Sequence, residues 1–410
     1  MRPIWSPWPR CRRKRRAQNW SKSKSIHWVA DNMNKPFPMK LSAVALLAAL
    51  ALSGCSLFSG SDNTPEPTPL KPLKPLVDLK VGWKNSVGDA GGYVFEPAFD
   101  GERVYTAGNN GRVQIIDPAT GREIGGFDTK VRLSAGVGVR DGRVFAVSER
   151  GELLAFTTQG ESRWKATLTS QALEAPQTDG KTVVVRTGDG NVTAFDFASG
   201  QQLWLYQRQQ PALSVRSTGA MQLLGSDVVL LGLPGGVLTV LGLADGRAMW
   251  EANVATPKGA TELDRMVDVA SRPVFDRGQV CAVAFQGRLS CFDARTATPM
   301  WSREVSSSKG IALDAANIYV TADDGSVQAF DRTDGRSVWR QDGFKYRKVE
   351  APALLGRFVV VTDGEGIAHL LSNESGDELG RASIGASGQP VAAGPNLLVQ
   401  GLGRIAQLGL

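Results

Sequence analysis

The most regular feature of the chain is a series of short apolar runs, each of which enters a turn and is followed by a second apolar run. Runs such as VFAVSERG and IYVTADDG are typical of strands that enter a tight turn, where glycine supplies the positive φ. The residues two and five positions after the glycine are apolar and lie on opposite faces of the next strand. Such a sheet must be covered on both faces. The turn glycines are Gly111, Gly151, Gly190, Gly236, Gly287, Gly325, Gly366 and Gly403.

These glycines define a repeat with a period near 40 residues, because their successive spacings are 40, 39, 46, 51, 38, 41 and 37 residues. This period is typical of a β-propeller with four strands per blade. The last copy ends at Leu410 after three strands, and residues 81–87, with Trp83, can supply the fourth. Pairing the two chain ends removes an exposed sheet edge. We therefore predict an all-β fold: an eight-bladed β-propeller with four antiparallel strands per blade, closed by the N- and C-terminal strands in the last blade.

A tryptophan marks the start of the last strand in most copies of the repeat. We expect each indole to fill the wedge between neighbouring blades, and truncation of such a side chain typically costs roughly 3–5 kcal/mol. These residues are Trp164, Trp204, Trp250, Trp301 and Trp339.

The pattern A-x-D-x-x-T-G-x-x-x-W within the repeat resembles the repeat of quinoprotein alcohol dehydrogenases, which bind pyrroloquinoline quinone (PQQ). In that family the repeat is structural, and the chemistry also needs an adjacent cysteine pair, calcium-binding acids and a central catalytic aspartate. None of the four cysteines here (Cys11, Cys55, Cys281, Cys291) is adjacent to another. We predict no catalytic residue, no cofactor and no metal site. The alternative is a periplasmic quinone-dependent dehydrogenase or a degenerate relative of one.

The two histidines do not belong to a recognisable catalytic set. His27 lies in the basic N-terminal region, and His369 lies inside a predicted strand, where a histidine is more often structural. No Ser-His-Asp set, metal-ligand spacing or phosphate-binding loop is visible. Acidic turns such as GDG and DDG suggest calcium, but they occur where each hairpin needs a turn.

Cys281 and Cys291 lie in VCAVAFQGRLSCF, whose turn centres on Gln286. Pairing Ala284 with Arg288 places the two cysteines opposite each other. Directly paired residues are close enough for a cross-strand disulfide in an oxidising compartment. The alternative is two small buried apolar side chains, because other copies place alanine at the position of Cys291.

The net charge of +7 belongs to the N-terminal region. Residues 1–32 carry nine basic residues and one acid, and residues 33–54 carry two lysines, so residues 55–410 have a formal charge of −3. The charge of residues 55–410 therefore does not favour a nucleic-acid partner for this part of the chain. We expect residues 1–32 to be a spurious or untranslated upstream extension that results from a misplaced start codon; the alternative is a basic nucleic-acid patch.

Residues 33–54 have the organisation of an export signal, with a start at Met33 or Met39. Two lysines precede an apolar run of about a dozen residues, too short to span a bilayer. The run ends in LSGC at residues 52–55, which resembles the lipobox of bacterial lipoproteins. The resemblance implies cleavage before Cys55 and lipid modification of its thiol. Ser56 implies the outer membrane, with the protein facing the periplasm, because Asp there would favour inner-membrane retention.

Residues 55–76 read SLFSGSDNTPEPTPLKPLKPL after the cysteine and are rich in Pro, Ser and Thr. A segment of this composition is not expected to pack. We therefore predict an extended tether over residues 55–76 and the propeller over residues 77–410.

Two adjacent spacings, 46 and 51 residues, exceed the period. The extra residues fall in 206–219 and 254–271, each between a tryptophan strand and the next blade. Equivalent positions on neighbouring blades should place both loops on one face, where they form an apolar patch with charges at its edge. The alternative is that both are tolerated insertions. The residues expected on this surface are Leu213, Val215, Arg216, Asp264, Arg265 and Asp268.

The chain from the lipobox onwards resembles the BamB family of lipoproteins, which belong to the outer-membrane β-barrel assembly (BAM) complex. The resemblance covers the lipobox, the tether, the eight repeats and both loops, and is most specific in PALSVRS and ATELDRMVDVASRPV. It implies that the loops dock on the periplasmic POTRA domains of BamA. The residues that match are Leu213, Val215, Arg216 and Asp268, whereas Ala270 stands where the family has a second acid.

The same resemblance implies a non-enzymatic scaffold that supports folding and insertion of outer-membrane proteins. Other subunits of the complex would be its partners, together with unfolded outer-membrane protein clients that add a strand to an exposed blade edge. A propeller that binds an unrelated partner is the remaining alternative.

Overall fold

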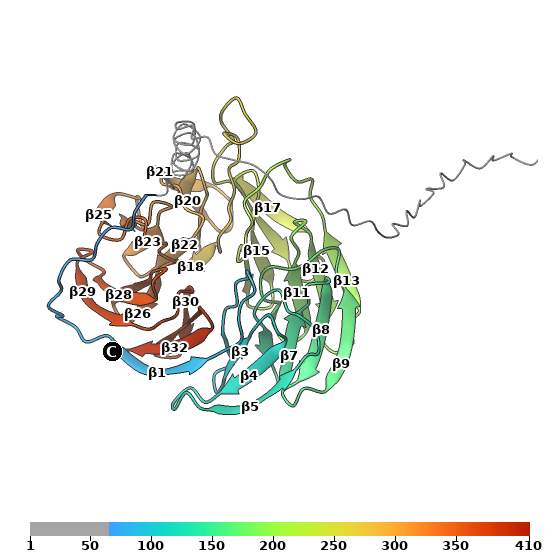
Figure 1. Ribbon diagram of the computed structural model, residues 1–410. Helices are drawn as coiled ribbons and strands as arrows, with labels where there is room; N and C mark the ends of the chain where they lie inside the picture. Colours follow the sequence, from blue (N-terminus) through green and yellow to red (C-terminus); the bar gives the residue numbers. More distant parts are fainter. Residues whose placement is uncertain (1–64) are drawn as a thin grey trace, which may run out of the picture. The chain divides into compact units, whose positions relative to one another are not determined.

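The computed structural model describes residues 65–410. The predicted extension 1–32, the export signal 33–54 and Cys55 lie outside the described residues. Within residues 65–410 the chain forms strands, turns and loops, and contains no helix long and apolar enough to cross a membrane. The strands form eight four-stranded antiparallel sheets arranged around a ring (Figure 1). The predicted eight-bladed propeller is confirmed.

Each blade begins with a short strand near the centre of the ring and ends with a strand on the outside (Figure 1). Blades 1 to 4 consist of β2 (Ala98–Phe99), β3 (Val104–Ala107), β4 (Arg112–Ile116) and β5 (Glu123–Asp128); β6 (Gly138–Arg140), β7 (Arg143–Val147), β8 (Glu152–Thr157) and β9 (Ser162–Thr167); β10 (Gln177–Thr178), β11 (Thr182–Arg186), β12 (Val192–Asp196) and β13 (Gln202–Tyr206); and β14 (Met221–Leu224), β15 (Val228–Leu233), β16 (Val237–Gly242) and β17 (Ala248–Asn253). Blades 5 to 8 consist of β18 (Val274–Asp276), β19 (Gln279–Val283), β20 (Arg288–Asp293) and β21 (Pro299–Glu304); β22 (Gly310–Leu313), β23 (Asn317–Thr321), β24 (Val327–Asp331) and β25 (Ser337–Gln341); β26 (Ala353–Leu355), β27 (Phe358–Thr362), β28 (Ile367–Ser372) and β29 (Glu378–Ser383); and β30 (Pro390–Ala393), β31 (Asn396–Gly401), β32 (Arg404–Gly409) and β1 (Lys80–Ser86).

The middle strands carry the core because neighbouring blades cover both of their faces. Every residue of β11, β19 and β27 is buried. These strands are rich in valine, whose branched side chain suits a pleated and fully packed surface. The outer strands alternate instead; in β13, for example, Trp204 is buried between exposed neighbours.

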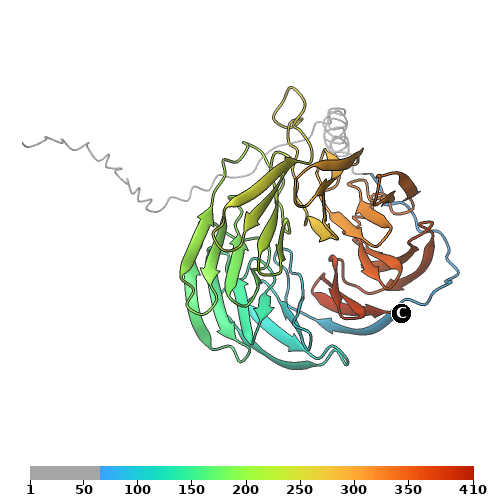
Figure 2. The same ribbon diagram turned by 180° about the vertical axis from the view of Figure 1, so that it is seen from behind.

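The ring is closed by the two ends of the chain. Strand β1 pairs antiparallel with β32, from Lys80 opposite Gly409 to Ser86 opposite Arg404. Figure 2 shows the N-terminal strand, in blue, beside the strand that carries the C-terminus. The predicted closure is therefore confirmed, and it covers the edge of β32 that would otherwise be open.

Tryptophans join neighbouring blades through one recurring contact. The indole N–H donates to a backbone carbonyl of the next blade over 2.7–3.1 Å, as Trp204 does to Leu243 (2.7 Å). The ring of Trp204 also lies on Gly246 of that blade, whose φ is 69° and where a Cβ would sit 2.5 Å from the ring. This glycine is required both by its left-handed backbone and by the close approach of the ring. The predicted filling of the wedge is confirmed.

The contact of Trp250 departs from this pattern because Ala297 takes the place of the turn glycine. Ala297 has a φ of 58°, and Trp250 is partly exposed. We expect Ala297→Gly to stabilise the protein by about 0.5 kcal/mol. Removing the strain of a left-handed alanine stabilises the folded state by roughly 1–2 kcal/mol. The greater conformational entropy of glycine in the unfolded chain lowers the stability by about 0.4–1 kcal/mol. Urea unfolding followed by tryptophan fluorescence measures the difference. Ala316→Gly, at an exposed turn residue without a positive φ, is the control, and a lower midpoint for Ala297→Gly would contradict the prediction.

Cys281 on β19 lies directly opposite Cys291 on β20. Their Cα atoms are 4.1 Å apart and their sulfur atoms are bonded at 2.03 Å. The turn is the predicted one, because Ala284 donates its N–H to the carbonyl of Arg288 and Gln286 has a φ of 48°. The disulfide interpretation is confirmed over the alternative of two free buried side chains.

The Pro-rich segment differs from its prediction in the part that the structure describes. Residues 65–76 lie against blades 6 and 7, and Figure 1 shows them, in blue, passing β25 and β29 before β1. Thr68 donates its N–H to the carbonyl of Lys345, and Leu76 donates to Leu379. The expectation that this stretch does not pack is wrong for these residues, because the chain can bond outward to the blades without any internal hydrogen bonds.

Candidate functional site

The two long connections predicted from the spacing lie together on one face of the ring. The first, residues 207–220, joins β13 to β14, and the second, residues 254–273, joins β17 to β18. Gly219 of the first pairs with Ser271 of the second. Figure 1 shows the second loop, in gold, projecting beyond the blades. We call the exposed surface of both loops the loop face; its residues are Leu213, Val215, Arg216, Leu263, Asp264 and Arg265.

Asp268 ties the two loops together from below. Its side chain is buried, with 2% of its surface exposed. One carboxylate oxygen accepts the N–H of Val215, and the other accepts the N–H of Gly235 over 3.0 Å. Burial raises the pKa of this carboxyl, although the two N–H donors oppose the shift. The expectation that Asp268 faces a partner is corrected: a carboxylate with both oxygens bonded inside the protein holds the first loop in place.

Replacing Asp268 by asparagine tests this tie. The amide presents an NH₂ group to one of the two backbone N–H donors, so one hydrogen bond is lost and a buried donor stays unsatisfied. We expect stability to fall by about 1–3 kcal/mol and hydrogen exchange at the Val215 amide to rise about tenfold or more. Asp264→Asn is the matched control, because Asp264 is exposed on the second loop. Unchanged exchange at Val215 would show that the carboxylate does not hold the loop.

A buried ion pair forms the floor beneath the first loop. Arg186, at the end of β11, lies 3.2 Å from Glu174, and both side chains are almost fully buried. The same guanidinium donates to Ser217, which donates to the carbonyl of Ala270 over 2.8 Å. The second oxygen of Glu174 accepts the N–H of Met221. A paired and bonded charge pair fixes the loop without an isolated buried charge.

The first loop exposes one apolar and one cationic side chain. Leu213 has 47% of its surface exposed, Val215 is half-buried, and Arg216 is exposed. The guanidinium of Arg216 lies over the ring of Tyr93, 5.4 Å from its centre, as in a cation–π contact. Tyr93 comes from the segment before blade 1, and its hydroxyl accepts a hydrogen bond from Gln171. No local sequence signal indicates this partner, because Tyr93 precedes blade 1 whereas Arg216 lies in the loop between blades 3 and 4.

The second loop exposes a further apolar residue beside its charges. Asp264 and Arg265 are exposed, as expected, and Leu263, which sequence reasoning missed, has 61% of its surface exposed. Asp264 accepts the N–H of Thr261, and hydrogen bonds from this residue lower the pKa of the carboxyl. The turn thus holds Asp264 in its charged form on the surface. An apolar residue flanked by fixed charges is typical of a protein-binding surface.

The loop face borders the mouth of the central channel. A cavity of about 360 Å³ is lined there by Tyr93, Arg216 and the ion pair of Lys309 with Glu350. Glu96, just before β2, and Arg272, just before β18, meet across the ring at 3.0 Å. Strands β2 and β18 begin blades 1 and 5, which are opposite each other in an eight-bladed ring. The channel is therefore crossed by an ion pair that no local sequence signal indicates.

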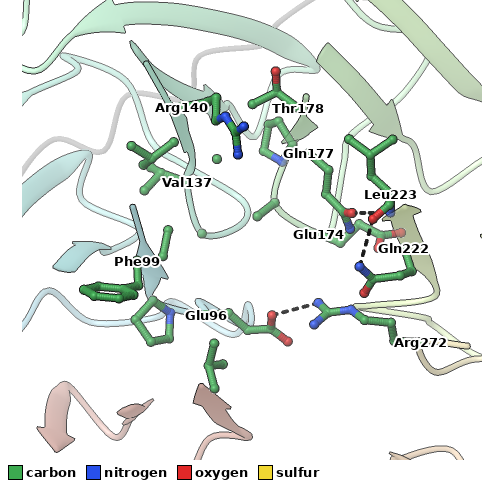
Figure 3. Close-up of a pocket in the computed structure, with 18 of the residues that line it drawn as sticks. Glu96, Phe99, Val137, Arg140, Glu174, Gln177, Thr178, Gln222, Leu223 and Arg272 are labelled. Carbon is green, nitrogen blue, oxygen red and sulfur yellow. Dashed lines mark hydrogen bonds and ion pairs between the residues drawn. The ribbon is translucent and has the colours of Figure 1, made fainter. Parts of the chain in front are cut away.

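A second cavity, of about 540 Å³, continues from this ion pair along the first strands of blades 1 to 4. Figure 3 shows Glu96 and Arg272 joined at its base, with Glu174 and Gln177 beside them. Gln177 is bonded on both sides of its amide, to the carbonyl of Met221 and the N–H of Leu223. Within residues 65–410, no group of three His, Cys, Asp or Glu side chains is placed to hold a metal ion.

His369, the histidine predicted to be structural, lies in β28 and is fully buried. Its Nδ1 lies 2.7 Å from Glu378 and its Nε2 lies 3.4 Å from Asp363. Both carboxylates are in turn bonded to arginines, Arg381 and Arg347. This chain of charges lies in blade 7, away from the loop face.

Comparison with known proteins agrees with the geometry. Residues 109–341 match the family model described as outer membrane protein assembly factor BamB. The protein of that name from Bordetella pertussis is 39% identical over 362 residues, which cover 88% of this chain and 93% of that protein. The crystal structure of BamB from Moraxella catarrhalis superposes with a TM-score of 0.75 at 25% identity, covering 81% of this chain and all of that one. Quinohemoprotein alcohol dehydrogenase from Comamonas testosteroni shares the fold alone, with a TM-score of 0.64 at 12% identity over 81% of this chain and 76% of the enzyme.

Proposed function

The chain belongs to the family of the outer membrane protein assembly factor BamB, and we propose that it is a non-enzymatic scaffold lipoprotein of the BAM complex. In this role it binds the periplasmic POTRA domains of BamA and supports folding and insertion of outer-membrane proteins. The observation that carries the proposal is the loop face, where two loops from neighbouring blades are tied together by the buried carboxylate of Asp268.

The chemistry of the loop face favours a protein partner. Leu213 and Leu263 are apolar side chains held in solvent, and burial of each against a partner is worth roughly 1.5–3 kcal/mol. Arg216 and Asp264 supply opposite charges beside them, which set the orientation of a partner and its rate of association. The backbone of the first loop is fixed from below, so little conformational entropy is lost on binding.

The proposal is tested by measuring the binding of residues 56–410 to the purified POTRA domains of BamA from the same organism. We expect a one-to-one complex whose formation protects the amides of residues 211–219 and 256–266 from hydrogen exchange. Binding with protection elsewhere on the ring would keep the function but move the site. Absence of binding would contradict the proposal.

We propose that the anchor is a lipid on Cys55, which holds the protein at the outer membrane on the periplasmic side. Cys55 lies outside the described residues, and the support comes from the lipobox at residues 52–55 and from Ser56. We expect Cys55→Ser to abolish labelling by radioactive palmitate and to release the protein from the membrane fraction. Cys281→Ser, made together with Cys291→Ser, is the matched control and should keep both properties. Continued labelling of Cys55→Ser would contradict the assignment.

A quinone-dependent dehydrogenase is the rival function, since its members share this fold. Two acidic side chains that line the larger cavity are already paired with arginines: Glu96 with Arg272, and Glu174 with Arg186. We therefore expect no dye reduction when the protein is mixed with PQQ, calcium and primary alcohols. Turnover in that assay would favour the rival.

A further inference from the structure

The segment that leads into β1 has a period of three. Residues 69–76 read PLKPLKPL, so that prolines, leucines and lysines each recur at every third position. A polyproline II helix has three residues per turn and no internal hydrogen bonds, so each residue type of this repeat occupies one edge of such a helix. We call residues 68–77 the PLK segment. Its repeat predicts one leucine edge, one lysine edge and one proline edge.

The leucine edge faces the propeller. Leu70 and Leu73 are half-buried, whereas the lysines and prolines between them are exposed. Leu70 packs against a core cluster of blades 6 and 7 that includes Trp339 and Phe344. The third leucine, Leu76, lies beyond this contact, with 77% of its surface exposed.

Two arginines bind the backbone of the PLK segment at the same interval of three residues. Arg347 donates from Nη1 to the carbonyl of Thr68 over 3.2 Å, and Arg381 donates from Nη2 to the carbonyl of Lys71 over 3.1 Å. Backbone carbonyls of a polyproline II helix have no partner inside the helix, so donors placed one turn apart can bind them in sequence. The two carbonyls bound by the arginines are therefore three residues apart, which is the period of the repeat.

Both arginines are fixed from behind by the buried charges of blade 7. Arg347 donates from Nε to Asp363 over 2.8 Å, and Arg381 donates from Nε to Glu378 over 2.9 Å. His369 lies between the two carboxylates. The guanidinium groups are thus preorganised before the segment docks.

The edge of blade 7 has room for the segment backbone and for little else. Val77 donates its N–H to Leu379 over 3.1 Å, and a Cβ on Gly380 would sit 2.3 Å from the carbonyl oxygen of Val77. Closer to Thr68, a cavity of about 580 Å³ remains between the segment and blades 6 and 7. A segment held by few backbone bonds over an incompletely filled cavity opens more readily than the core.

We propose that the groove between β25 and β29 is a polyproline II-binding site, that its resident ligand is the chain's own PLK segment, and that docking of this segment is a reversible latch on the tether. When the latch is closed, the chain is attached to the propeller from Thr68 onwards. When the latch is open, the PLK segment is detached and the chain is first held by the propeller at β1.

The latch changes the reach of the tether. Thirteen residues separate Cys55 from Thr68, and twenty-five separate Cys55 from Lys80. At about 3.3–3.6 Å per extended residue, the maximal reach is about 45 Å with the latch closed and about 85 Å with it open. This consequence rests on the anchor at Cys55 proposed above, whereas the binding site itself does not.

Hydrogen exchange in the intact protein tests the latch. We expect the amides of Thr68, Leu76 and Val77 to be protected, and Leu70→Ser combined with Leu73→Ser to speed their exchange about tenfold or more. Lys71→Ser combined with Lys74→Ser is the matched control, because it changes the exposed edge of the same segment and should leave exchange unchanged. Insertion of one alanine after Leu70 breaks the period of three and should act like the leucine variant.

Three outcomes would overturn the proposal. Unprotected amides in the wild type would show that the segment is not docked, and equal exchange in the leucine and lysine variants would show that no edge is specific. Loss of protection across β25–β29 in the leucine variant would show that the segment is an inseparable part of the blades. Because the measurement needs neither lipid nor POTRA domains, its failure is distinguishable from failure of the proposed function.

Discussion

Replacing Arg216 with glutamate should weaken binding to the POTRA domains about 100-fold or more. The substitution removes the guanidinium that lies 5.4 Å from the centre of the Tyr93 ring and places a negative charge at the same point of the loop face. Losing one partner of a close charged contact at an interface typically costs about 2–5 kcal/mol, and an introduced like charge adds to this. Isothermal titration of wild type and variant with the same POTRA preparation measures the ratio of dissociation constants.

Two further variants distinguish the effect of the charge at residue 216 from the effect of a charge change elsewhere on the ring. Arg216→Lys keeps the charge but loses the planar group that stacks on Tyr93, so we expect an intermediate loss of about tenfold. Arg163→Glu changes the charge of an exposed arginine on the outer strand of blade 2, away from the loop face, and should have little effect. If Arg216→Glu binds like the wild type, the interface does not include the first loop.

Replacing His369 with glutamine should destabilise the propeller by about 3–5 kcal/mol, the usual cost of removing one partner from a buried set of charges. Burial lowers the pKa of the imidazole, but its hydrogen bonds to the carboxylates of Asp363 and Glu378 outweigh it, so that the pKa lies above its ordinary value. The pKa values of both carboxyls are lowered by their contacts with His369 and the arginines, although burial acts in the opposite direction. Without the imidazolium, two buried carboxylates lose their shared partner.

The direction of these shifts fixes the pH dependence. A histidine whose pKa is raised by folding contributes its full stability below its unfolded value of about 6.5 and loses it as the pH rises through the folded value. Across that window the wild type should lose about 1.4 kcal/mol per pH unit. The carboxyls act oppositely: their contribution is present above about pH 4 and is lost as the pH falls through their lowered folded values.

Urea unfolding between pH 6 and 9 measures the histidine contribution. His369 is the one histidine in residues 65–410, so no second imidazole complicates the profile. We expect the wild-type midpoint to fall with pH in this range and the midpoint of His369→Gln to stay nearly constant. A wild-type profile as flat as that of the variant would show that the imidazole is neutral in the folded protein.

Features set by short-range pattern could be predicted from the sequence. The glycine repeat predicts the number of blades, the position of each tryptophan predicts the contact with the next blade, and the turn at Gln286 predicts the register that joins Cys281 to Cys291. In each case the residues that interact are neighbours on one hairpin or lie about one repeat apart. The period of the strand and the period of the blade together determine their separation.

Features that depend on contacts across the ring could not be predicted. Glu96 and Arg272 are 176 residues apart, and nothing in either segment specifies the other. Asp268 has the polar character of a surface residue in the sequence, yet it is buried because two backbone N–H groups from different segments converge on it. The PLK segment shows its period of three, but the arginines that bind it come from residues about 280 and 310 positions later.

The pairing of β1 with β32 also constrains the order in which the protein becomes folded. Lys80 is opposite Gly409, so the first strand of the propeller pairs with a strand that is synthesised after all the others of the ring. Contacts of such long sequence separation form late and slowly, because most of the chain must be ordered before they are made. Until β32 is in place, β1 and β31 have open edges that other chains can join. A ribosome that stalls before β32 therefore yields a chain with seven complete blades and an unsealed ring, which is a substrate for chaperones and proteases.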